Sequence, residues 1–219
     1  MKKLTTLAIL IVLHCLLDAC CDVDNFCFTF NTIGGNNISM VTYEAFEEGV
    51  DTVQSNAYGI ELSTDIRTRT CLLSGSFGSS LYAITCEDPI YVLTDKIRKI
   101  TIRSNADLNE NFPAGSDLNR FFRPVLYDTN CGNFNPGSID CASDVFEDDP
   151  TLSLESAVST ILIQSVESAE LYPGIFDYLP ILDFDISEDI IPQAYVFTVQ
   201  FEFESGQSLE AVTEEVILK

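Results

Sequence analysis

Residues 195–204 read YVFTVQFEFE, and this stretch decides the fold class. Every second residue from Tyr195 to Phe203 is aromatic or aliphatic, and the residues between them are mostly polar. A period of two is typical of a β-strand with one face in a hydrophobic core and the other in water. Ser205-Gly206-Gln207 then predicts a turn and Leu209–Leu218 a returning strand, so we expect a C-terminal β-hairpin.

Other segments show the same periodicity. Tyr58–Ile66 alternates cleanly, and Ile97–Arg103 is rich in isoleucine with a basic outer face. Arg69–Ser74 and Leu81–Cys86 flank a loop of Gly and Ser that predicts a second hairpin. Many strands with turn signals between them predict a mainly β protein, an antiparallel β-sandwich of the immunoglobulin-like type.

The remaining segments are less regular. Ser116 or Asp117 could cap one or two short helical turns through Leu118, Phe121 and Phe122. Residues 130–150 predict a long loop, and residues 167–193, with three prolines, predict irregular connections. The β-branched content of Val158–Val166 favours a strand, although a helix stays open.

The first residues indicate export. Lys2 and Lys3 precede an apolar run from Leu7 to Leu17, which is too short to cross a bilayer. The following Leu17-Asp18-Ala19-Cys20 is similar to the lipobox of bacterial lipoproteins. We therefore expect a signal peptide over residues 1–19, lipid on Cys20 that anchors the chain to a membrane, and one domain over residues 20–219 behind a short tether. An ordinary secretory signal is the alternative.

Composition excludes several functions for the chain after residue 19. Its 9 basic and 33 acidic residues give a net charge of −24, and residues 124–218 contain 19 acids and no base. Such a surface repels nucleic acid. His14, the only histidine, is removed with the signal peptide, so a mature chain has no imidazole for catalysis or metal binding.

Six further cysteines follow Cys20, and an even number in an exported chain favours disulfides over a zinc site. Cys131 and Cys141 enclose a turn-rich loop whose ends close easily, which predicts their bridge. We also predict a bridge between Cys71 and Cys86 across the expected hairpin, and the alternative is a bridge between Cys27 and Cys86. If Cys131–Cys141 and Cys71–Cys86 both form, Cys21 and Cys27 are left to form the third bridge.

Part of the chain resembles a family of uncharacterised Bacteroidetes outer-membrane lipoproteins, a domain of unknown function. The segments that carry this resemblance are Leu93–Ile97, Ile100–Ile102, Ser104–Asp107, Pro113–Asn119, Leu81–Cys86 and Phe197–Val199 with the Ser205-Gly206 turn. The resemblance implies an exported, lipid-anchored domain of the cell envelope, with surface display left open, and it assigns no activity.

Two function classes remain. The first class, which we prefer, is a non-catalytic module that uses no cofactor and either binds a glycan or protein or has a structural role. The second class is a histidine-free hydrolase of glycans that would use two carboxylates. Exposed tyrosines would suit sugar binding, and Tyr127, Tyr172 and Tyr178 are the candidates. The acids of two loops are candidates for calcium ligands, and simple solvation of these acids is the alternative: Asp140, Asp144, Asp148, Asp183, Asp185 and Asp189.

Overall fold

The computed structural model describes residues 25–41, 52–71, 90–129, 142–144, 151–171, 178–186 and 189–219. The prediction of a mainly β chain is confirmed. The elements of the described residues are β1 (Asn25–Ser39), β2 (Thr52–Val53), η1 (Ser55–Ala57), β3 (Tyr58–Cys71), β4 (Tyr91–Leu93), β5 (Ile97–Ser104), η2 (Asn119–Phe121), β6 (Phe122–Asp128), β7 (Ala142–Asp144), α3 (Leu154–Leu171), β8 (Tyr178–Phe184), β9 (Gln193–Tyr195), β10 (Phe197–Phe203), β11 (Ser208–Val212) and β12 (Val216–Leu218).

The chain divides into two compact units. The first comprises residues 1–28 and 68–92, and the second comprises residues 29–67 and 93–219. In the described part of the first unit, the rings of Phe26 and Tyr91 stack with centroids 5.3 Å apart, and the Phe26 N–H donates to the Ile90 carbonyl at 2.9 Å. The expectation of one domain over residues 20–219 stays a prediction.

The largest sheet among the described residues has six strands in the order β4-β1-β3-β8-β6-β7. Its strand β8 corrects the sequence analysis, which expected residues 167–193 to be irregular. The strand was missed because Pro180 predicts an interruption, whereas in the structure Pro180 pairs with Leu126 of β6. The pairing of β8 with β3 ends at Ile181, next to Pro180, as expected where a proline removes a ladder donor.

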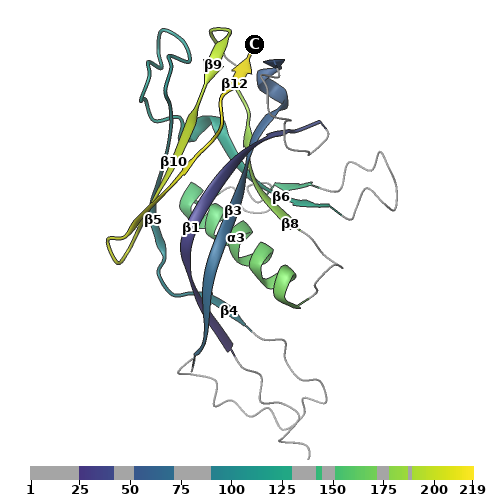
Figure 1. Ribbon diagram of the computed structural model, residues 1–219, viewed down its shortest axis with the longest axis vertical. Helices are drawn as coiled ribbons and strands as arrows, with labels where there is room; N and C mark the ends of the chain where they lie inside the picture. Colours follow the sequence, from purple (N-terminus) through teal and green to yellow (C-terminus); the bar gives the residue numbers. More distant parts are fainter. Residues whose placement is uncertain are drawn as a thin grey trace, which may run out of the picture. The chain divides into compact units, whose positions relative to one another are not determined.

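The C-terminal hairpin is confirmed, with differences at both ends. β10 pairs antiparallel with β11 and with β5, and Gly206 in the turn has a φ of 89°, which favours glycine. Tyr195, however, belongs to β9. The expected strand Leu209–Leu218 is divided into β11 and β12, which belong to different sheets, and β12 pairs with β9 and β2 (Figure 1).

Within the second unit, strands β3, β6 and β8 pack face to face with the sheet β11-β10-β5. Phe197 of β10 contacts Tyr58 of β3, Phe122 of β6 and Phe184 of β8, with ring centroids 5.3, 5.8 and 5.9 Å apart. All four rings are at most 2% exposed. Sheet-on-sheet packing around an aromatic core is the sandwich arrangement that alternation predicts; its immunoglobulin-like type stays a prediction.

Residues 158–166 are helical, so the preferred expectation of a strand was wrong and the alternative is confirmed. They belong to the 18-residue helix α3, which packs against β5, β6 and β8. Ser153 caps it, because its hydroxyl accepts from the Ser156 N–H at 3.2 Å. The helical turn expected near Leu118 is confirmed as η2, but its N-cap is Leu118 and not Ser116 or Asp117. The helix α3 is much longer than the short turns that the sequence predicts.

The buried residues of α3 recur at a helical period, which explains why the β-branched content misled the sequence analysis. They are Ala157, Val158, Ile161, Leu162, Val166 and Ser168.

Candidate functional site

The acids that the sequence suggests as calcium ligands have different neighbours in the structure. Asp183 is directly opposite Arg123 in the pairing of β8 with β6, and the Asp185 carboxylate lies 2.5 Å from the Arg123 guanidinium. A guanidinium therefore already balances part of the charge of this loop. The Asp189 carbonyl accepts from the Asn109 side chain at 3.2 Å, and the backbone of Asp144 pairs with Val125.

Asp140 and Asp148 lie outside the described residues. Among the residues that are described, no group of three or more histidines, cysteines or acids is arranged to hold a metal ion. The idea of calcium ligands therefore rests on the sequence alone.

The tyrosines proposed for sugar binding are partly buried. Tyr127 packs with Met40 and Leu179 against a buried cluster of Ile38, Val125 and Ile181. Tyr178 is half-buried in β8, opposite Asp128. Tyr172 lies outside the described residues. Neither described tyrosine is a fully exposed platform, and the packing of Tyr127 gives it a structural role.

One disulfide is present in the described residues, and it corrects the predicted pairing. Cys27 of β1 is bonded to Cys71 of β3, with an S–S distance of 2.04 Å and a Cα–Cα distance of 5.6 Å. The bridges Cys71–Cys86, Cys27–Cys86 and Cys21–Cys27 are therefore wrong. Both residues were expected to be disulfide-bonded, and that is confirmed. Cys20, Cys21, Cys86, Cys131 and Cys141 lie outside the described residues, so lipidation and the Cys131–Cys141 bridge stay predictions.

The reason for this pairing is strand register. Asn36 and Asn31 of β1 donate to Glu61 and Asp65 of β3, so residue numbers fall along one strand as they rise along the other. The two strands are thus antiparallel neighbours, and the same register continued along them brings residue 27 opposite residue 71. The predicted bridges relied on the ease of closing short loops. This criterion carries no information about a pair of cysteines as far apart in the sequence as Cys27 and Cys71.

A polar network is buried in the second unit. The Tyr58 hydroxyl donates to Asn37 Oδ1 at 2.7 Å, and Asn37 Nδ2 donates to the Glu214 carbonyl at 2.8 Å. Thr213 Oγ1 donates to the same carbonyl at 2.9 Å and accepts from the Phe197 N–H at 3.0 Å. Burial raises the pKa of the Tyr58 phenol well above its ordinary value. The network fixes the loop between β11 and β12.

A carboxylate hydrolase would need two facing carboxylates, one of them buried. In the described part of the chain, the buried polar residues are Asn37, Thr101, Ser104, Ser168 and Thr213. The hydrolase therefore stays an alternative that rests on the sequence alone.

One face of the sheet β11-β10-β5 is mostly polar and exposed to solvent, although Thr101 within it is buried. Its inner face carries Phe197, Phe201 and other buried apolar residues. The opposite face, here called the outer sheet face, follows from the register: Lys99, Thr101 and Arg103 on β5; Thr198, Gln200 and Glu202 on β10; Ser208, Glu210 and Val212 on β11.

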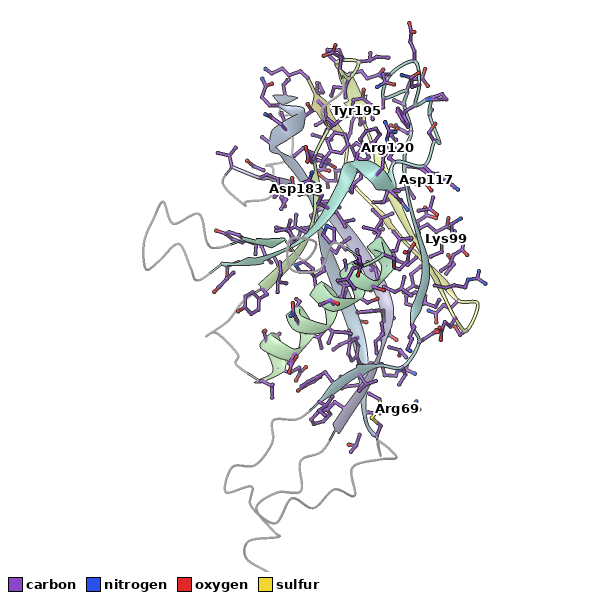
Figure 2. The ribbon with its side chains drawn as sticks, turned by 180° about the vertical axis from the view of Figure 1, so that it is seen from behind. Arg69, Lys99, Asp117, Arg120, Asp183 and Tyr195 are labelled. Atoms are coloured by element: carbon purple, nitrogen blue, oxygen red, sulfur yellow. A yellow bond between two sulfur atoms is a disulfide. The ribbon has the colours of Figure 1, made fainter. Side chains whose placement is uncertain are left out.

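The charges of the outer sheet face form rows. Lys99 and Arg103 form a basic row on β5. Lys99 is labelled in Figure 2, on the same side of that view as Arg120. Glu202 lies beside this row and accepts from Arg98 at 2.8 Å. The hydrogen bond from Arg98, followed by the charges of Arg98, Lys99 and Arg103, holds the pKa of Glu202 below its ordinary value. The basic row is unusual in so acidic a chain, and sequence alternation alone located it.

The edge of β5 that faces away from β10 is closed by side chains and loops. Asn119 accepts from the Ile102 N–H at 2.9 Å and donates to the Ile100 carbonyl at 2.8 Å. Glu155 of α3 accepts from the Ile100 N–H at 3.2 Å, and the Leu118 N–H donates to the Ile102 carbonyl at 2.8 Å. The Asn119 amide thus replaces a peptide group of a neighbouring strand. Sequence reasoning missed this role, because only the fold brings residue 119 beside β5.

No family model, curated protein or solved structure matches this chain. No helix among the described residues combines the length and hydropathy needed to cross a membrane.

Proposed function

We propose that this chain is a lipid-anchored protein of the cell envelope that binds a protein or glycan partner without catalysing a reaction. The outer sheet face is the observation that carries the binding part. It is a mostly polar surface, with the apolar Val212 on β11 and the buried Thr101 on β5, and the other face of the sheet belongs to the aromatic core, so its side chains are held by rigid strands.

The anchor is supported by the sequence. The basic start, the short apolar run and Cys20 match a lipoprotein signal in order and length. Two or three acyl chains bind a bilayer far more firmly than one. The proposed place is the outer membrane, in keeping with the family resemblance, and either of its faces would expose the outer sheet face to water.

The anchor is tested by intact mass and detergent partition of the protein purified from a bacterial envelope. We expect cleavage before Cys20, an added acyl mass and partition into detergent. Cys20→Ser should abolish all three, whereas Cys21→Ser is the matched control and should keep them. A mature chain with a free amino terminus and no acyl mass would disprove the anchor.

The binding surface is tested with the lipidated protein in nanodiscs, screened against surface glycans and envelope proteins of the same bacterium. A genuine ligand should lose affinity when Lys99 and Arg103 are both replaced by Glu, and it should keep its affinity for the control Arg67→Glu, which lies on β3. Release of cleaved glycan in the same screen would favour the hydrolase instead.

A further inference from the structure

The two edges of the sheet β11-β10-β5 differ. At one end of the C-terminal hairpin the Phe203 N–H donates to the Gln207 carbonyl at 2.9 Å, and at the other the Thr213 N–H donates to the Phe197 carbonyl at 3.0 Å. Hydrogen-bonded and non-hydrogen-bonded pairs alternate along an antiparallel ladder. The backbone groups of Ser208, Glu210 and Val212 therefore point away from β10.

These outward groups have no partner within the described residues. β11 pairs with β10 alone, and neither a side chain nor a loop of the described chain bonds to the outward N–H or C=O groups of β11. By contrast, Asn119, Leu118 and Glu155 close the edge of β5. An open row of alternating donors and acceptors is a template for another strand.

The side chains of this edge indicate what would pair with it. Val212 is 53% exposed, which is high for a large apolar residue in a strand. Glu210 is exposed at the centre of the edge, and no cation of the described residues forms an ion pair with it. In an added strand, the residue opposite Glu210 would place its side chain on the same face, where opposite charges attract across the ladder.

We propose that the β11 edge binds an extended peptide segment of a partner protein by strand addition, with a lysine or arginine opposite Glu210 and an apolar residue beside Val212. A second copy of this chain fits less well. Two β11 strands related by a two-fold axis at residue 210 would place two Glu210 carboxylates side by side, and like charges directly opposite destabilise a ladder. The strongly acidic chain adds to this repulsion.

This inference deepens the proposed binding function, since it names the partner chemistry of the same sheet. The probe is a synthetic seven-residue peptide of alternating Thr and Val with a central Lys, titrated into isotope-labelled full-length protein in detergent. Amide shifts in the NMR spectrum report the site. We expect saturable shifts at residues 208–212, and a peptide with central Glu should bind about two- to fivefold more weakly, the usual range for one cross-strand pair.

Backbone methylation tests strand addition directly. N-methyl groups on the central and alternate peptide residues, which would face β11, should abolish binding, whereas N-methyl groups on the intervening residues should not. Val212→Pro removes an outward N–H without removing a bond to β10, so it should weaken binding while the remaining spectrum is unchanged. Glu210→Lys should reverse the preference between the two peptides, and the matched control Glu215→Lys should not.

Several results would overturn the proposal: shifts outside β11, equal binding of both methylated peptides, or concentration-dependent dimers with shifts at β11 in the absence of peptide. None of these affects the acyl mass or the glycan screen, so this inference can fail while the proposed function holds. Absence of lipid would sink the anchor and leave the peptide result intact.

Discussion

Asn119 stabilises the fold by satisfying backbone groups of an edge strand, and its removal should be costly. Its amide makes two hydrogen bonds, of 2.9 Å from the Ile102 N–H and 2.8 Å to the Ile100 carbonyl, and both isoleucines are fully buried. Asn119→Ala leaves one donor and one acceptor without a partner, each at a cost of about 1–3 kcal/mol. Because Asn119 is only half-buried, water relieves part of this, so we expect a loss of about 2–4 kcal/mol in the free energy of unfolding.

The assay is urea unfolding of wild type and variant followed by circular dichroism, with equal m-values as the condition for comparison. Asn31→Ala is the matched control, since the exposed Asn31 makes one long bond of 3.3 Å to Asp65; it should cost less than about 0.5 kcal/mol, as surface changes usually do. Equal losses in the two variants would refute the reasoning, because the Asn119 bonds would then contribute no more than a solvated pair.

Three further predictions concern other groups. Tyr58→Phe should flatten the fall of stability above about pH 10, because the raised pKa of the buried phenol keeps its proton in the folded state and that stabilisation is lost as pH rises; an unchanged slope in pH-dependent urea unfolding would contradict this. Cys27→Ser should lower the free energy of unfolding by about 4 kcal/mol, the loop-entropy value for a separation of 44 residues. Non-reducing peptide mapping of the wild-type protein should find Cys27 joined to Cys71, and any other partner of Cys27 would contradict the bridge. Arg98→Ala should destabilise at neutral pH, but the difference from wild type should vanish as pH falls through the lowered pKa of Glu202; a difference that persists once Glu202 is protonated would rule out this ion pair.

Local periodicity predicted the strands whose two faces differ. Tyr58–Ile66 lies within β3, Ile97–Arg103 lies within β5, and β10 with β11 forms the hairpin expected after Tyr195, although the returning strand ends at Val212. The strand β8 has apolar residues on both sides, with Ile181 and Leu182 both buried. It therefore lacks the alternation that reveals a strand, and Pro180 added a misleading signal.

The long-range contacts could not be predicted in the same way. The Cys27–Cys71 bridge depends on the register of two strands, and the role of Asn119 depends on the return of the chain to β5. The outer sheet face could be predicted only in part. Alternation assigns each residue to a face of its strand, but only the strand order brings Lys99 and Glu202 together. No signal within a single segment reveals the edge of β11, with which no strand of the described residues pairs.

The carbonyl of Glu214 has a consequence for how this chain diverges. Asn37 and Thr213 both donate to that carbonyl, at 2.8 and 2.9 Å, and every residue type has one. The side chain at position 214 is exposed, so mutation can change its size and charge over generations without removing the buried bonds. Substitutions of Asn37 or Thr213, by contrast, would remove a donor of the buried network. The architecture at this loop therefore depends on the main chain of residue 214 and tolerates any side chain there that stays in solvent.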